Sequence, residues 1–137
     1  MNKLKFDPNC DGNLWLTELP YAVNFTNNGY VWLCNLKTIP TGTKFNNKGN
    51  VDLYRLTELP EGIEFNNKGN VDLYELKTLP KDVKFNNEGY YVWLPKLNYE
   101  ELSYDQFMYI YPKLESEIQT ELKYLNRKHK LKKILNI

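Results

Sequence analysis

A repeat of about 20 residues, present four times in succession, constrains the fold of this chain more than any other feature. The units begin at Leu16, Leu36, Leu56 and Leu76. The fourth unit carries one extra residue near Tyr90 and Tyr91, and a partial unit at residues 12–16 precedes the first. A segment this short cannot bury its own apolar side, so neighbouring units must pack on one another.

Each unit contains two short runs in which apolar residues alternate with polar ones. Val51-Asp52-Leu53 represents the first run and Ile63-Glu64-Phe65 the second. Alternation with a period of two predicts strands that bury one face. A proline recurs every 20 residues between the runs, as at Pro60, and an Asn-Asn-x-Gly segment recurs on the other side, as at Gly69. Proline cannot donate to a strand ladder, and glycine and asparagine tolerate positive φ, so both segments predict corners.

These features predict a mainly β fold, a small parallel β-solenoid of four to five coils over residues 1–97, right-handed by the general preference of parallel crossovers. Like residues of successive coils would form buried columns. The expected columns are Leu33, Leu53, Leu73 and Leu94; Val31, Val51, Val71 and Val92; Leu36, Leu56 and Leu76; and Phe25, Phe45, Phe65 and Phe85. A chain of antiparallel hairpins closed at Asn-Asn-x-Gly is the structural alternative.

The units resemble short leucine-rich-like repeats of the form L-x-x-L-P-x-G-x-x-F-x-N-x-G-x-V-x-L, which occur in proteins of bacteria, phages and mobile elements. The resemblance covers about two-thirds of the chain and implies a β-solenoid with a binding surface in place of a catalytic centre. It further implies a phage or mobile-element inhibitor of a host protein, for example a CRISPR or other defence effector. The C-terminal segment, which does not repeat, departs from this pattern.

Residues 98–137 predict a helical C-terminal segment. Ser103 and Gln106 fit a capping box, and Pro112 both ends the first helix near Tyr111 and opens a second. Leu114, Ile118, Leu122 and Leu125 then form one apolar stripe at helical spacing. We expect this stripe to cap the open end of the solenoid, with a dimerisation helix as the alternative.

The residues that would point outward from the Val-x-Leu strands are the candidate site. They combine exposed aromatic side chains with two aspartates, a composition typical of protein-binding surfaces. The candidate partner-binding residues are Trp15, Tyr30, Trp32, Asp52, Tyr54, Asp72, Tyr74, Tyr91 and Trp93. The alternative is that these aromatic rings only stack on one another or lie under the C-terminal helices.

Catalysis has little support in this sequence. Asp52 and Asp72 would lie roughly 5 Å apart, as carboxylate pairs do in retaining glycosidases, but they recur only because the units recur. His129 is the only histidine and lies in the basic tail, so a serine or cysteine nucleophile lacks an imidazole base. Cys10 and Cys34 lack metal-ligand spacing, and no glycine-rich phosphate loop is present. We therefore expect no enzyme activity, cofactor or metal, and we expect Asn47, Asn67 and Asn87 to be turn and stacking residues.

The basic tail supports a second hypothesis. Arg127, Lys128, Lys130, Lys132 and Lys133 could contact phosphate. With tyrosines as stacking surfaces, the chain would then bind nucleic acid or a ribonucleoprotein. A net charge of +1 over 137 residues does not favour this alternative. Glycan binding ranks third and would require a location outside the cell.

The absence of a secretory signal and of a long apolar run predicts a cytoplasmic protein without membrane contact. Taken together, the repeats, the outward aromatic residues and the weak support for catalysis make a non-catalytic module that binds another protein the first hypothesis for the function of this chain.

Overall fold

The computed structural model describes residues 16–87 and 90–135. Eight two-residue strands alternate between two four-stranded sheets, in the orders β1-β3-β5-β7 and β2-β4-β6-β8. The first sheet contains β1 (Asn24–Phe25), β3 (Lys44–Phe45), β5 (Glu64–Phe65) and β7 (Lys84–Phe85). The second contains β2 (Val31–Trp32), β4 (Val51–Asp52), β6 (Val71–Asp72) and β8 (Val92–Trp93).

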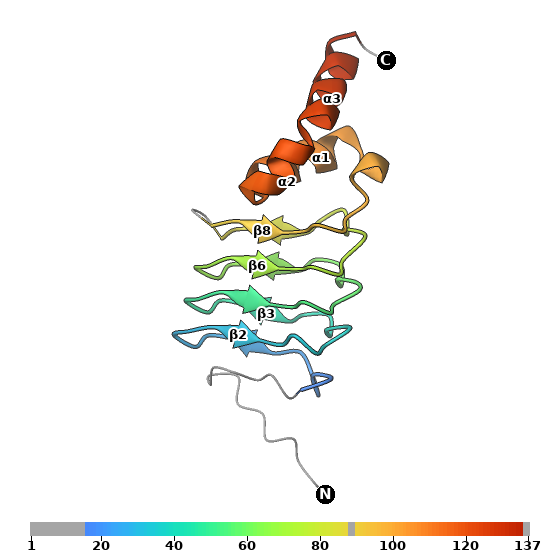
Figure 1. Ribbon diagram of the computed structural model, residues 1–137. Coiled ribbons are helices and arrows are strands. Elements are labelled where there is room, and N and C mark those ends of the chain that lie inside the picture. Colours follow the sequence, from blue (N-terminus) through green and yellow to red (C-terminus); the bar gives the residue numbers. More distant parts are fainter. Residues whose placement is uncertain (1–15, 88–89, 136–137) are drawn as a thin grey trace, which may run out of the picture.

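The fold is a parallel β-solenoid, as the repeat predicts (Figure 1). All strand pairs are parallel and join equivalent residues of successive units, as in Phe45 with Phe65 and Val51 with Val71. The antiparallel hairpin alternative is therefore wrong. From β1 to β8 the chain makes about three turns, and residues 12–15 of the partial unit that raised the expected number to four or five lie outside the described residues.

The predicted columns form the core between the two sheets. Every member of the leucine, valine and phenylalanine columns is at most 2% exposed. The four phenylalanine rings stack in sequence, with centroids 5.1 to 5.3 Å apart. This spacing is close to the distance between neighbouring strands, so each ring lies directly over the ring of the preceding coil.

Buried asparagines hold the Asn-Asn-x-Gly corner together. Asn67 Nδ2 donates to the carbonyl oxygens of Gly49 and Gly69 at 3.1 and 3.0 Å, and so joins two coils. Asn47 and Asn87 make the equivalent bonds to the coil before each. The prediction that these asparagines are structural is confirmed.

The glycines of this corner are required for a reason other than the expected one. Gly49 and Gly69 do not adopt positive φ, but a Cβ on either would lie 2.7 Å or less from backbone of the preceding coil. Positive φ occurs instead at Gly42 and Gly62, two residues after the corner prolines. Close approach of coils therefore selects glycine at one corner, and backbone conformation selects it at the other.

The C-terminal segment begins with the short 3-10 helix η1 (Tyr99–Glu101) and α1 (Tyr104–Ile110). The predicted capping box is present, because Ser103 accepts from the Gln106 backbone and the Gln106 side chain accepts from the Ser103 backbone. The expectation that Pro112 opens the helix that carries Leu114, Ile118, Leu122 and Leu125 as one stripe is wrong. Pro112 lies in the 3-10 helix η2 (Tyr111–Lys113), and two further helices follow, α2 (Ser116–Glu121) and α3 (Lys123–Leu135).

The reason for this division is that Leu114 is extended and pairs with the last coil. It forms a parallel bridge with Val92, and Glu115 N donates to Val92 O at 3.3 Å. On the other sheet, the Tyr109 hydroxyl accepts a hydrogen bond from Phe85 N at 2.8 Å. Both sheet edges of the last coil are thus met by the C-terminal segment. Its buried side chains join the same core cluster as the solenoid: Phe107, Ile110, Leu114, Ile118 and Leu125.

Candidate binding groove

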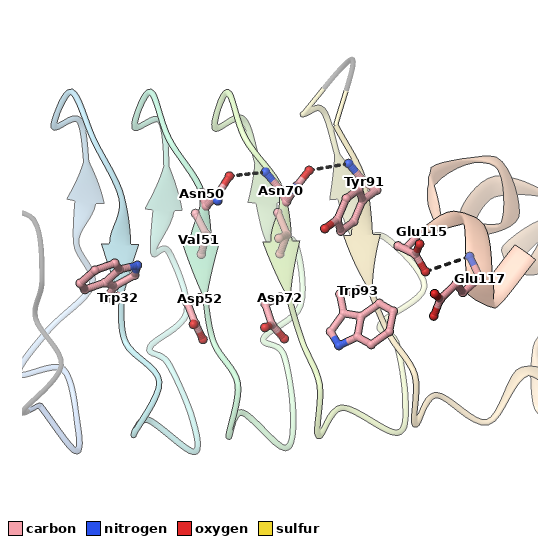
Figure 2. A pocket seen from close by; sticks show the side chains of 11 residues that line it. Trp32, Asn50, Val51, Asp52, Asn70, Asp72, Tyr91, Trp93, Glu115 and Glu117 are labelled. Atoms are coloured by element: carbon pink, nitrogen blue, oxygen red, sulfur yellow. Dashed lines mark hydrogen bonds between the residues drawn. The ribbon is translucent and has the colours of Figure 1, made fainter.

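One row of outward-facing side chains crosses the sheet β2-β4-β6-β8. Strand register places Trp32 beside Asp52, Asp52 beside Asp72, and Asp72 beside Trp93. The valine before each of these residues is buried, so alternation along the strand turns the four side chains outward. Figure 2 shows the two aspartates on neighbouring strands with a tryptophan at each end of the row.

This row lies in a hollow of about 450 Å³, which we call the outer groove. The residues that line it are Trp32, Asn50, Val51, Asp52, Asn70, Val71, Asp72, Tyr91, Trp93, Glu115 and Glu117. Four of them are carboxylates, and none is Lys, Arg or His. The groove therefore presents an acidic floor between aromatic walls.

The two aspartates are half-buried, and each carboxylate accepts a backbone hydrogen bond two residues further along the chain. Tyr54 N donates to Asp52 Oδ1 at 3.0 Å, and Tyr74 N donates to Asp72 Oδ1 at 3.1 Å. Burial raises the pKa of Asp52 despite its backbone hydrogen bond. Burial and the neighbouring Asp52 charge raise the pKa of Asp72 to about 6, against the lowering effect of the Tyr74 N–H. A cation placed over this pair would relieve both the lost hydration and the repulsion.

A chain of hydrogen bonds forms one margin of the groove. Asn50 Oδ1 accepts from Asn70 N at 2.8 Å, and Asn70 Oδ1 accepts from Tyr91 N at 3.0 Å (Figure 2). These bonds run from coil to coil and use both asparagine acceptors within the protein. They place Tyr91 in line with Asn50 and Asn70. Tyr90 is therefore the extra residue of the fourth unit.

Glu115 and Glu117 come from the C-terminal segment, and the sequence did not indicate them as site residues. Glu115 caps α2 by accepting from Glu117 N at 2.9 Å. The pairing of Leu114 with Val92 brings this helix start to the Trp93 end of the groove. No local pattern could have revealed this placement, because both glutamates read only as favourable residues in the first turn of a helix.

The other predicted aromatic residues lie near the groove and partly stack on one another. Tyr30 stacks on Trp32 with ring centroids 5.5 Å apart, and Tyr54 stacks on Tyr74 at 4.6 Å. Tyr30, Trp32, Tyr54 and Tyr91 stay 37 to 46% exposed. Stacking and exposure therefore coexist on this face, while Trp93 packs partly against the core. Trp15 lies outside the described residues.

The predicted phosphate contacts lie on α3 and do not line the outer groove. Arg127, Lys128, Lys130, Lys132 and Lys133 are all exposed. Lys133 Nζ lies 5.1 Å from the centroid of the Tyr104 ring, a cation–π arrangement between α3 and α1.

Within residues 16–87 and 90–135, no group of three or more His, Cys, Asp or Glu side chains is arranged to hold a metal ion. None of the helices described in the structure is both long and apolar enough to cross a membrane.

Comparison with protein-family models, with curated proteins and with solved structures found no match to this chain. The outer groove and α3 are therefore the two features from which a function can be inferred.

Proposed function

We propose that this chain is a non-catalytic protein-binding module and that the outer groove receives its partner. The observation that carries the proposal is the placement of half-buried Asp52 and Asp72 between Trp32 and Trp93 in one hollow. Binding energy in protein interfaces concentrates in a few residues, often aromatic, that lie near the centre of the contact, where the surrounding contacts exclude water. Carboxylates at the floor of such a site confer selectivity for a partner with positive charge.

Inhibition of a host protein, such as a CRISPR or other defence effector, is the finer form of this proposal. It rests on the resemblance of the repeats to those of phages and mobile elements.

The test is affinity capture of partners from a host lysate with the full chain as bait. The informative variant is Trp32→Ala/Trp93→Ala, which removes both walls while leaving the buried valines in place. The matched control is Lys44→Ala/Lys84→Ala, two exposed positions on the outer face of the other sheet. Capture should be nuclease-resistant, should persist in the control, and should fall at least about 10-fold in the tryptophan variant.

Thermal melting of each variant checks that the fold is retained, since Trp32 also stacks on Tyr30. A folded tryptophan variant that captures the same proteins as the parent chain would refute the proposal.

The alternative function is binding of nucleic acid or a ribonucleoprotein through α3. It is favoured by one observation, the five exposed basic side chains on a helix that extends away from the sheets (Figure 1). Such binding would disappear with nuclease, fall steeply with salt, and be lost in Arg127→Ala/Lys128→Ala while surviving in the tryptophan variant. A protein interface in the outer groove predicts the opposite result in each of these comparisons.

A further inference from the structure

Apart from the cation–π contact of Lys133 with Tyr104, the far half of α3 packs on no other part of the described chain. The near half is anchored, because Leu125 is 2% exposed and His129 stacks on Phe107 with centroids 4.6 Å apart. From Lys130 to Leu135, by contrast, every residue is exposed. Figure 1 shows this helix leading away from the sheets. A helical segment that packs against so little is only marginally stable in water.

The far half of α3 carries large apolar side chains on one side of the helix. Leu131, Ile134 and Leu135 are 55, 78 and 54% exposed. At about 100° per residue, Ile134 lies opposite Leu125, and Leu131 and Leu135 lie to one side of Ile134, within about 100° of it. Arg127 lies within the same arc one turn earlier, and Lys128 lies at its edge, about 60° from Leu125; both are exposed. We call these five residues the outer face of α3.

The outer face of α3 and the outer groove are complementary in charge and in chemistry. The groove has four carboxylates and no cation among its lining residues, and its walls are indole rings. The helix face has two cations and three exposed aliphatic side chains. Aliphatic groups pack well on indole, and both Arg and Lys are attracted to indole faces as well as to carboxylates.

The dimensions also agree. Trp32 and Trp93 stand three strand spacings apart, or about 14 Å. A helix with its side chains is about 10–12 Å across, which is close to this separation of the two strands. The α3 of the same copy extends away from this sheet, so the helix that enters the groove must come from another molecule (Figure 1).

We propose that the outer face of α3 of one copy docks in the outer groove of a second copy. Arg127 and Lys128 meet Asp52 and Asp72, and the aliphatic residues lie against the tryptophan walls. The inference rests on the proposed function and names the partner. The two surfaces are different, so the contact is head-to-tail and builds either a closed ring or an open chain of copies.

The test is sedimentation velocity of the full chain from low micromolar to near-millimolar concentration, at low and high salt. Association should increase with concentration and weaken with salt, since charges of opposite sign meet at the contact. A chain that stays monomeric at the highest concentration in low salt would overturn the inference.

Two variants locate the contact. Asp52→Asn/Asp72→Asn keeps the shape of the groove and one acceptor oxygen in each side chain but removes the charge of the two aspartates, and Arg127→Glu/Lys128→Glu reverses the charge at these two positions of the helix. Each should raise the dissociation constant at least about 10-fold. Lys44→Glu/Lys84→Glu on the other sheet is the control and should associate as the parent chain does. Association that is unchanged in the first two variants would overturn the inference.

Mixing two chains with reversed charges tests whether the contact between groove and helix can be restored by complementation. Asp52→Lys/Asp72→Lys places two cations on the groove floor, and Arg127→Glu/Lys128→Glu places two carboxylates on the outer face of α3. Neither should associate alone, and the mixture should form a complex that contains both chains. If the lysine variant fails to fold by circular dichroism, the asparagine variant decides the outcome.

These results are separable from those of the lysate experiment. A monomeric chain whose captured protein partner is lost in Trp32→Ala/Trp93→Ala would overturn self-docking and leave the proposed function intact.

Discussion

Asp72 is the residue at which charge and burial conflict most clearly. Its pKa is raised to about 6 from an ordinary 3.8, first by burial and then by the charge of Asp52. A carboxyl whose folded-state pKa is raised contributes stability below its unfolded pKa, and this contribution is lost as the pH rises through about 6. At neutral pH the ionised Asp72 therefore lowers the free energy of unfolding. Such a loss of stability is typical of residues retained for binding.

We predict that Asp72→Asn stabilises the protein above pH 6 and leaves its stability nearly unchanged below pH 3.8. The gain should be roughly 1 kcal/mol, allowing for solvent screening of a half-exposed group. Thermal melting between about pH 3 and pH 8 measures it. Asp82→Asn is the control of opposite sign, because the Gly62 N–H lowers the pKa of Asp82. Equal effects of the two substitutions at neutral pH would contradict this account.

A second residue-scale prediction concerns the buried asparagine of the corner. Asn67→Ala removes the donor that serves Gly49 O and Gly69 O, and it leaves two carbonyls without that partner. The expected loss is about 2 kcal/mol in the free energy of unfolding, measured by denaturant titration. Asn46→Ala, at an exposed position of the same corner, should change stability by less than about 0.5 kcal/mol. Similar losses at both positions would show that Asn67 does not join the coils.

At the scale of elements, the strands were predictable and the helices only partly so. Residues such as Val51 and Phe65 recur at fixed positions of each unit, and burial of one face follows directly from their alternation. The extended conformation of Leu114 was not predictable, because it depends on pairing with Val92, a contact between segments that share no pattern. The same contact carries Glu115 and Glu117 into the outer groove, which explains why the sequence indicated only part of the site.

The reason for glycine at Gly49 and Gly69 was not predictable from the sequence either. A glycine in a turn segment suggests positive φ, whereas here the space between stacked coils leaves no room for a Cβ. Distances between coils exist only in the assembled solenoid. The pattern within one unit therefore predicts where the corner lies, but it does not show that close approach of the coils is the reason for glycine there.

The hydrogen bond between the Tyr109 hydroxyl and Phe85 N, at the last strand of the first sheet, can be tested by removing one hydroxyl group. Tyr109→Phe leaves Phe85 N without its partner at the last coil and should destabilise the fold by about 1 kcal/mol. Tyr124→Phe is the matched control, since that hydroxyl donates to the exposed Glu100 carboxylate and its loss should have little effect. Denaturant titration of both variants gives the comparison. A neutral Tyr109→Phe would mean that water replaces the hydroxyl at this edge.

For the molecule as a whole, the repeat sets the width of the outer groove. Deletion of residues 56–75 joins two corners of the same kind, so the chain should still fold cooperatively, with a lower melting temperature because one coil is lost. Trp93 would then stand two strand spacings from Trp32, about 10 Å in place of about 14 Å. Circular dichroism and sedimentation should show a folded chain that no longer self-associates. Loss of cooperative unfolding would contradict the view that coils are interchangeable.

The bridge between Val92 and Leu114 also has a consequence for the order of events during synthesis. The ribosome completes the coils one after another, so the last strand leaves it before the segment that covers it. At typical bacterial to eukaryotic elongation rates, Leu114 follows Val92 by about one to four seconds. During that interval the newest coil presents an open edge to every other nascent chain nearby. The edge of the last coil, which later lies at the Trp93 end of the outer groove, is thus exposed to other chains while the protein is being made.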